Sequence, residues 1–210
     1  MKNLYIIGAR GFGREVYNLF LECKNSLQDV DCKGFLDNNS SALDGFDNYP
    51  PIISSVEDYI LQPDDVFICA LGDPKWIKYY TEIIEKKGGK FISLISPGAY
   101  VSKNVIIGDG CIVAGWTCIS CDITIGKHCS IGVFSNLGHD VVVGDCCHLG
   151  SYTFIGGHVN IGDRVTIHPR VNVIPNKKIE SDSILGAGSV VIRNVKRGIT
   201  VFGNPARIIN

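Results

Sequence analysis

The feature that most constrains the fold is a six-residue repeat, which runs without insertion or deletion from Asn104 to Arg193. Its fifteen consecutive hexapeptides share an aliphatic residue at the fourth position, and Gly often follows at the fifth. A period of six is neither that of an α-helix nor that of an alternating strand, so it indicates a repeat architecture. Short strands joined by tight corners and stacked as a parallel β-helix satisfy this period. The fourth-position residues are Ile107, Val113, Ile119, Ile125, Ile131, Leu137, Val143, Leu149, Ile155, Ile161, Ile167, Val173, Ile179, Leu185 and Val191.

The repeat also predicts how side chains are arranged in space. Three hexapeptides make one triangular coil, so residues one coil apart in the sequence lie above one another at the parallel-strand spacing of about 4.8 Å. Fourth-position side chains then stack inside the coil, and the second position lies at a corner that admits only small side chains. Cys111, Cys129 and Cys147 occupy that second position, which we interpret as small apolar filling. Gly at the fifth position is expected to supply a positive φ where the chain turns.

Composition narrows the classes of function. A chain of 210 residues with 45% hydrophobic content can bury the core of one domain or of two small ones. The net charge of −1 argues against a nucleic-acid partner or an anionic membrane partner. No apolar run approaches the roughly 20 residues that span a bilayer, and the N-terminal run is too short for a signal peptide. Nine cysteines, an odd number, favour reduced thiols over a disulfide framework and hence a cytoplasmic location.

The hexapeptide pattern is absent from the first ninety or so residues, where strands and helices alternate instead. We predict strands over residues 4–8, 31–37, 66–72 and 91–96, and helices over residues 13–24 and 74–88. Such alternation predicts a parallel sheet. The chain is therefore expected to hold two domains, a Rossmann-like α/β domain over residues 1–91 and a β-helix over residues 92–210.

The turn after the first strand is a glycine-rich loop, which reads GARGFG from Gly8 to Gly13. A loop of this kind lets backbone N–H groups at a helix N-terminus approach a phosphate. Asp37 closes the second strand, which strengthens this interpretation, although a simple tight turn from strand to helix is the alternative. About ninety residues are only half of a dinucleotide-binding fold, so a nucleotide with one pyrophosphate fits better.

Taken together, these features resemble the left-handed β-helix acyltransferases of the hexapeptide-repeat family, and within it the bacterial nucleotide-sugar acetyltransferases. The resemblance covers essentially the whole chain. It implies a left-handed coil, although the general crossover rule favours right-handed connections. It also implies a homotrimer with active sites between subunits, acetyl-CoA as co-substrate and no metal. The implied reaction is transfer of acetyl to the amino group of a UDP-4-amino-4,6-dideoxy sugar in surface glycan biosynthesis.

The resemblance assigns the acceptor, a nucleotide-activated sugar, to the glycine-rich loop and its surroundings. The residues implied to bind it are Arg10, Gly11, Phe12, Asp37, Asn38 and Gly72. This chain has Arg10 where a Ser is usual in the family, and Phe12 where a His is usual. Arg10 could pair with a phosphate and Phe12 could stack, so the identity of the sugar nucleotide stays open.

All five histidines lie in the repeats, and His139 stands out because it occupies a corner position and precedes Asp140. Transfer of acetyl to an amine needs a base, and an imidazole suits that task. A carboxylate bound to the ring fixes its tautomer. We therefore predict that His139 is the general base and Asp140 its partner, the alternative being a surface histidine. In the family, Glu is more usual than Asp at the position of Asp140, so the shorter side chain could leave the pair with His139 less well aligned.

For the donor, the resemblance implies that His148 approaches the thioester, unless it is a structural histidine. Gly157 follows His139 by one coil and is expected to stack on it, where its N–H could stabilise the oxyanion. Pro169 and Ala187 match positions that contact the pantetheine arm. Arg207, in the closing GNPAR segment, is assigned to the CoA phosphates or is a solvated terminal charge.

Three other functions use the same fold. A sugar or sialic-acid O-acetyltransferase needs the same base, so the sequence barely separates it from an N-acetyltransferase. A non-catalytic nucleotide-sugar scaffold is disfavoured by the His139–Asp140 pair. A γ-type carbonic anhydrase holds a metal with three histidines, but here the histidines do not form a single column of the coil and no His-x4-His occurs. We therefore predict no metal site and assign His128, His158 and His168 to the surface or to CoA contacts.

Overall fold

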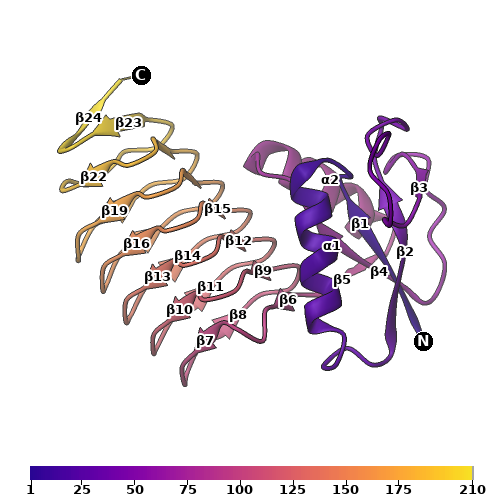
Figure 1. Ribbon diagram of the computed structural model, residues 1–210. Helices are drawn as coiled ribbons and strands as arrows, with labels where there is room; N and C mark the ends of the chain where they lie inside the picture. The colour runs from indigo at the N-terminus through magenta and orange to yellow at the C-terminus, as the bar shows by residue number, and fades with distance from the viewer. Residues whose placement is uncertain (210) are drawn as a thin grey trace. The chain divides into compact units, whose positions relative to one another are not determined.

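The computed structural model describes residues 1–209 and divides into two compact units, one from Met1 to Leu94 and the other from Ile95 onwards (Figure 1). The division falls three residues after the boundary expected from the sequence. Neither helix in the described part of the chain is long and apolar enough to cross a membrane. The two units are described separately below.

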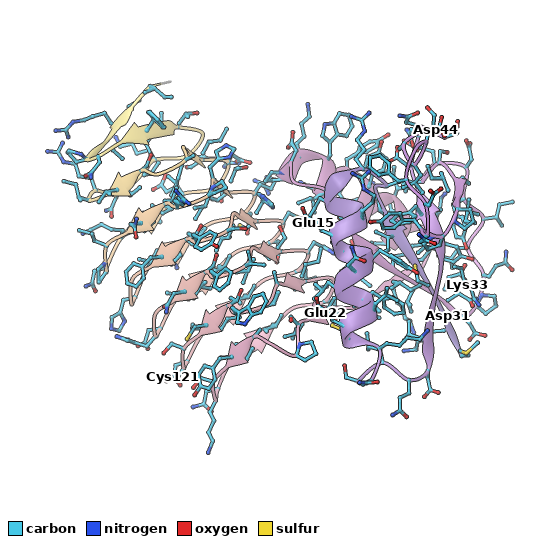
Figure 2. The ribbon with its side chains drawn as sticks, viewed as in Figure 1. Glu15, Glu22, Asp31, Lys33, Asp44 and Cys121 are labelled. Atoms are coloured by element: carbon cyan, nitrogen blue, oxygen red, sulfur yellow. The ribbon has the colours of Figure 1, made fainter. Side chains whose placement is uncertain are left out.

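The first unit is a five-stranded parallel sheet in the order β3-β2-β1-β4-β5, with two helices in the crossovers. Its elements are β1 (Lys2–Ile7), α1 (Gly11–Cys23), β2 (Val30–Leu36), β3 (Ile52–Ser54), β4 (Asp65–Cys69), α2 (Pro74–Lys86) and β5 (Lys90–Phe91). Leu4, Phe35 and Phe67 are fully buried between the layers. Asp31 and Lys33, two residues apart on β2, pair at 2.8 Å at the margin of the sheet (Figure 2). The alternation of strands and helices thus gave the predicted parallel sheet.

The strand order places a possible binding crevice in this unit. The chain runs from β1 to β2 on one side and later to β4 on the other, so β1 lies between them. In open α/β sheets the crevice at such a reversal, outside the carboxyl ends of the strands, is where ligands bind. The loop after β1, the segment after Leu36 and the segment after Cys69 all meet there.

Two sequence expectations for this unit need correction. The short edge strand β3 was not predicted, because three residues are too few to show a pattern. The predicted strand over residues 91–96 is two strands that belong to different sheets. β5 pairs with β4 in the first sheet, whereas β6 (Leu94–Ile95) pairs with β9 of the second unit. An apolar run without a Gly or Pro gave no sign of this break.

The second unit is a parallel β-helix, as the repeat predicts. Its strands form three sheets, in the orders β22-β19-β16-β13-β10-β7, β20-β17-β14-β11-β8 and β24-β23-β21-β18-β15-β12-β9-β6. From β7 to β22 the strands pair in parallel with the strand three further along, so Cys118 on β10 faces Asn136 on β13, the equivalent place of the next coil. Figure 1 shows the coils stacked in sequence order.

The bounds of these strands follow the hexapeptide register, because most strands occupy the third and fourth positions. They are β7 (Tyr100–Val101), β8 (Ile106–Ile107), β9 (Ile112–Val113), β10 (Cys118–Ile119), β11 (Thr124–Ile125), β12 (Ser130–Ile131), β13 (Asn136–Leu137), β14 (Val142–Val143), β15 (His148–Leu149), β16 (Phe154–Ile155), β17 (Asn160–Ile161), β18 (Thr166–Ile167), β19 (Asn172–Val173), β20 (Lys178–Ile179), β21 (Ile184–Leu185), β22 (Val190–Val191), β23 (Thr200–Gly203) and β24 (Ala206–Ile208).

The interior of the coil is built from the fourth and second positions. Fourth-position side chains from Val113 to Val191 form one continuous buried cluster. Second-position cysteines are buried as well, and they do more than fill space. The Cys129 thiol donates to the Gly144 carbonyl at 3.0 Å, and Cys111 and Cys147 make the same contact with a glycine 15 residues further on.

The reason for glycine at the fifth position differs from the one expected. Positive φ occurs at the first position of the hexapeptide, for example at Trp116 (54°), His158 (58°) and Asp182 (64°). Fifth-position glycines instead let neighbouring coils approach. A Cβ added to Gly144 would lie only 2.7 Å from the backbone carbon of Gly162, one coil on. Close approach between coils, not turn geometry, therefore excludes a side chain there.

This explanation makes a prediction about stability. Gly144→Ala forces a methyl group against backbone that cannot move without opening the coil spacing, so we expect the free energy of unfolding to fall by about 1–3 kcal/mol. Gly188→Asn is the matched control, because Gly188 has φ +70° and no atom within 4 Å of an added Cβ, and Asn tolerates this conformation. Urea denaturation of both variants checks this, and equal losses would contradict the coil-spacing explanation.

Candidate active site

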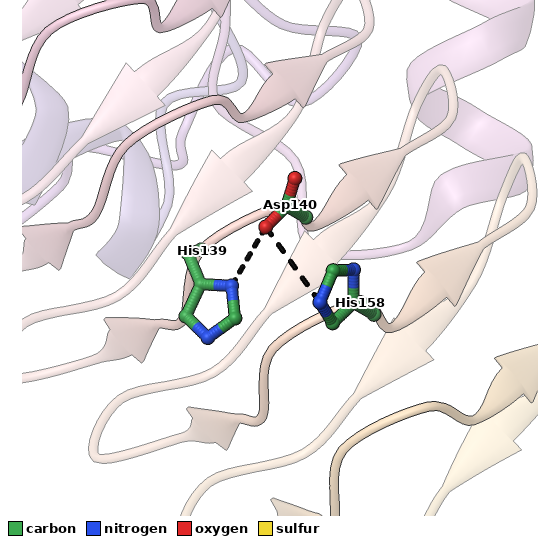
Figure 3. A group of neighbouring side chains, drawn as sticks. All are labelled: His139, Asp140 and His158. Carbon is green, nitrogen blue, oxygen red and sulfur yellow. Dashed lines mark hydrogen bonds and ion pairs between the residues drawn. The ribbon is translucent and has the colours of Figure 1, made fainter.

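One corner of the β-helix gathers ionisable side chains from two successive coils. His139 and Asp140 lie between β13 and β14, and Gly157 and His158 occupy the same places one coil further on, between β16 and β17. Figure 3 shows both imidazole rings beside the Asp140 carboxylate. The three side chains are about half exposed, so a substrate can reach them. We call this place the His139 corner.

His139 and Asp140 form the predicted pair. Nδ1 of His139 lies 2.7 Å from Oδ2 of Asp140, which is a short hydrogen bond. Because an ionised carboxylate only accepts hydrogen bonds, Nδ1 carries the proton and Nε2 of the neutral ring is left with its lone pair. The shorter side chain of Asp, compared with the Glu usual in the family, does not prevent the contact.

Gly157 stacks on His139, as its place one coil later implies. A Cβ at this place would lie 2.8 Å from Nε2 of His139, so only glycine leaves room for the ring. Within residues 1–209 the Gly157 N–H donates to no protein group. At another corner the N–H of Lys127 is satisfied by the Asp145 side chain of the next coil. The residue one coil after Gly157 is Pro175, whose side chain has no acceptor, so the Gly157 N–H stays open beside the imidazole.

A second carboxylate lies one coil below the pair. Asp122 occupies the place of Asp140 in the preceding coil, and it accepts a hydrogen bond from the Asn104 amide at 3.0 Å. That hydrogen bond is the main cause of a lowered pKa of Asp122, followed by a hydrogen bond from Cys121, with a smaller effect of His139. Asp122 therefore stays ionised and adds negative charge to the His139 corner.

His158 belongs to this group, although the sequence analysis assigned it to the surface or to CoA. Its Nε2 lies 3.8 Å from Oδ2 of Asp140 (Figure 3), and its ring meets that of His139 edge to face with centroids 5.0 Å apart. The signal that could have found it is the coil spacing, because His158 follows Asp140 by one coil. The sequence analysis applied this spacing to His139 and Gly157 but not to Asp140.

The residues assigned to the donor do not all gather at the His139 corner. His148 lies on β15, in the sheet across the triangle, where its Nδ1 is 2.7 Å from the Ser130 hydroxyl. Burial lowers the pKa of His148, and the charge of His168 adds to this effect. Pro169 and Ala187 stack at the corner that follows this sheet, and the Gly188 N–H donates to the Pro169 carbonyl at 2.9 Å.

Arg207 lies on β24, the last strand, where it is exposed and faces Phe202 in an antiparallel pairing. β23 and β24 extend the same sheet that carries His148. The residues predicted to bind the donor thus fall into two groups within one chain, with Gly157 at the His139 corner and the others on the sheet of β15 or at its margin.

The first unit contains a pocket of about 580 Å³ at the crevice that the strand order predicts. Five of the six residues assigned to the acceptor line it, and the sixth, Gly11, lies between two of them. Its lining includes Gly8, Arg10, Phe12, Asp37, Asn38, Asn39, Ala70, Leu71, Gly72, Asp73, Trp76 and Tyr80. The walls come from the glycine-rich loop, the segments after β2 and β4, and the first turns of α2.

The three glycines of the loop have different reasons to be glycine. Gly8 has φ +94°, and an added Cβ would lie 2.8 Å from Leu71. Gly13 packs its Cα against the Gly8 carbonyl, where no Cβ fits. Gly11 meets nothing within 4 Å, so neither backbone conformation nor packing requires glycine there.

The N-terminus of α1 is open towards an anion. Its cap residue, Arg10, makes no side-chain capping bond, and the first turn holds no acidic residue. The first N–H groups of a helix lack internal partners and carry partial positive charge, which favours a phosphate. Asp37 holds this loop in place, because Oδ2 accepts from the Ala9 N–H at 2.8 Å and Oδ1 from the Asn39 N–H at 2.9 Å.

The sequence analysis missed two aromatic residues of this pocket. Trp76 and Tyr80 lie one turn apart on α2 and stack with centroids 5.9 Å apart at 28°. The Asn38 amide donates to the Tyr80 hydroxyl at 3.3 Å, which joins this aromatic wall to the segment after β2. Their spacing of four residues shows that they share a helix face, but only the packing of α2 shows that this face borders the pocket.

Comparison with known proteins agrees with both halves of this arrangement. Residues 3–88 match the PglD N-terminal domain, and residues 122–157 match the bacterial transferase hexapeptide (six repeats). A curated relative, UDP-N-acetylbacillosamine N-acetyltransferase of Bacillus subtilis (strain 168), is 32% identical over 117 residues. The match covers 54% of this chain and 51% of that protein, about half the length of each.

Two solved structures are similar over nearly the whole chain. PerB from Caulobacter crescentus, in complex with CoA and GDP-perosamine, is 26% identical with a TM-score of 0.90, covering 100% of this chain and 98% of that one. The acetyltransferase domain of PglB from Neisseria gonorrhoeae, in complex with acetyl coenzyme A, is 25% identical with a TM-score of 0.63, covering 99% of both chains. The predicted resemblance to hexapeptide-repeat nucleotide-sugar acetyltransferases is thus confirmed.

Proposed function

We propose that this protein transfers the acetyl group of acetyl-CoA to the amino group of a nucleotide-linked amino sugar. The observation that carries the proposal is the His139–Asp140 pair beside the open N–H of Gly157. The similar proteins support it, because they include a sugar-nucleotide N-acetyltransferase and an acetyltransferase domain that binds acetyl coenzyme A. Our specific proposal for the acceptor is a UDP-linked 4-amino-4,6-dideoxy sugar. We propose that the reaction takes place in the cytoplasm, as a step of surface glycan biosynthesis.

The chemistry follows from the geometry of the His139 corner. The amino nitrogen attacks the thioester carbonyl, and Nε2 of His139 takes the proton that the nitrogen loses. The Gly157 N–H donates to the oxygen that becomes negative, and such a contact is worth about 3 kcal/mol of barrier in other enzymes. When the carbon–sulfur bond breaks, the imidazolium returns its proton to the CoA thiolate. Asp140 holds the ring and stabilises the imidazolium without reacting itself.

The pocket of the first unit suits the nucleotide part of the acceptor. The open end of α1 and Arg10 face the phosphates in this proposal, and Gly11 leaves the backbone accessible to them. The stacked pair of Trp76 and Tyr80 offers a flat wall for the base. Asn38 beside them offers an amide, which can both donate and accept.

The aromatic wall leads to a prediction. Trp76→Ala removes a stacking surface, and base stacking on an aromatic side chain contributes about 1–3 kcal/mol, so we expect KM for the sugar nucleotide to rise about tenfold or more. KM for acetyl-CoA should stay unchanged. Leu21→Ala is the control, because Leu21 is a similarly exposed large apolar side chain on α1 that does not line the pocket. Steady-state kinetics decide, and an equal effect of both variants would count against the wall.

A homotrimer completes the proposal. His148, Pro169 and Ala187 lie away from the His139 corner of their own chain. A donor that contacts both groups therefore needs a second copy, whose β15 sheet would face the His139 corner of the first. Sedimentation at micromolar concentration is expected to show a trimer, whereas a stable monomer of 22.8 kDa with full activity would contradict it.

One experiment tests the function itself. The purified protein is mixed with acetyl-CoA and with 4-amino sugars linked to UDP, GDP or CMP, and release of the CoA thiol is followed with product mass. Thiol release that depends on an amino sugar nucleotide is expected. O-acetyltransfer is the second candidate, because the same base serves a hydroxyl. Release of the CoA thiol only with sugars that offer a hydroxyl and no amino group would support O-acetyltransfer. Binding of the sugar nucleotide without thiol release, seen as a thermal shift, would indicate a non-catalytic scaffold.

A further inference from the structure

We infer that the His139 corner also binds a transition-metal ion, with Zn²⁺ as the best fit, and that this ion inhibits the enzyme. Three ligand atoms face one another there, Nδ1 of His139, Oδ2 of Asp140 and Nε2 of His158, and all lie within 4.8 Å of one another. Two imidazoles and a carboxylate are donors that Zn²⁺ accepts.

The distances suit a metal after small side-chain rotations. Ligand atoms about 2.1 Å from a tetrahedral zinc ion are about 3.4 Å apart. Here the carboxylate oxygen of Asp140 is 2.7 Å from the nitrogen of His139 and 3.8 Å from that of His158, which brackets this value. Both imidazoles aim a nitrogen at the same oxygen, as Figure 3 shows.

The backbone that carries these ligands is firmly placed. His158 and His139 belong to adjacent coils, and the His158 N–H donates to the His139 carbonyl at 2.9 Å. The three side chains are about half exposed, so an ion can enter and a water molecule can complete its coordination. Asp122, one coil below, adds negative charge near a dication.

Inhibition follows from which nitrogen the metal takes. A metal can take the lone pair of Nδ1 of His139 only when the single proton of the neutral ring has moved to Nε2. Nε2 then has no lone pair and cannot take the proton of the acceptor amine. This part rests on the proposed function, whereas metal binding does not. The ion is therefore an inhibitor of the reaction and not a cofactor.

Calorimetric titration of the full-length protein with Zn²⁺ tests the site. We expect one strong site per chain, and His158→Asn should weaken it roughly 10–100-fold or more, since even loss of an outer-shell partner costs that much. Asn fits the backbone at this place, because Asn104 and Asn176 occupy the same column with φ near 60°. His168→Asn, an exposed histidine outside the cluster, should keep the wild-type affinity.

A nearby thiol offers a second test of the site. Cys121 lies in the column of His139, one coil earlier, so Cys121→Ser distinguishes a metal site that uses the cysteine from the proposed one. Unchanged affinity in His158→Asn, or loss in Cys121→Ser alone, would overturn the site. In the acetyl-transfer assay, Zn²⁺ should lower the rate of the wild type and a chelator should restore it. Binding without inhibition would overturn the inhibitory role and leave the function of His139 to be tested by its own variants.

Discussion

His139→Ala is expected to lower kcat by about 10²–10⁴-fold, the usual range for a lost general base, with little change in KM for the sugar nucleotide. The reason is local. The pocket that we assign to the nucleotide lies in the first unit, whereas His139 lies in the second, with its Nε2 beside Gly157. Steady-state kinetics at saturating acetyl-CoA measure both constants.

Graded variants make this prediction sharper. Asp140→Asn should cost less than His139→Ala, because Asp140 orients the ring at 2.7 Å but does not touch the nucleophile. Both side chains are about half exposed, so neither replacement leaves a cavity, and thermal unfolding should confirm an intact fold. Wild-type turnover of a folded His139→Ala at neutral pH would remove His139 from the mechanism.

Most of the β-helix could be predicted from the sequence, because every hexapeptide repeats the same pattern of inward-facing and outward-facing residues. The fourth-position aliphatics define the inward face, and the period of six then defines the coil and which residues stack between coils. The pattern could not show why a particular residue type is required at each position of the repeat. Glycine at the fifth position suggests a turn, but only the contact with the next coil, as at Gly144, shows that space is the constraint.

The candidate site was predictable where residues are neighbours in the chain or in the coil. His139 with Asp140 needs no tertiary information, and Gly157 needs only the coil spacing. The same spacing links Asp140 to His158. Trp76 and Tyr80 were different, because their place in the pocket depends on how α2 packs beside the end of β4. No local pattern distinguishes them from Tyr79, which is equally aromatic and lies outside the pocket.

The loop after β1 gives the second large expected effect. Gly11→Val should raise KM for the sugar nucleotide about 10–100-fold, because a branched side chain keeps the pyrophosphate from the first N–H groups of α1, and hydrogen bonds to a charged group contribute about 1.5–3 kcal/mol. KM for acetyl-CoA should hardly change. The substitution is a clean test, since a Cβ on Gly11 meets no atom within 4 Å and its φ is not positive.

The neighbouring glycines supply the contrast that interprets the result. Gly13→Val must disturb the loop, because a Cβ there collides with the Gly8 carbonyl, so it should lower the melting temperature as well as acceptor binding. Gly11→Val should lose acceptor binding with an unchanged melting temperature. Weaker binding of acetyl-CoA alone in Gly11→Val would mean that the loop serves the donor, and the assignment of the nucleotide sugar to the first unit would have to be abandoned.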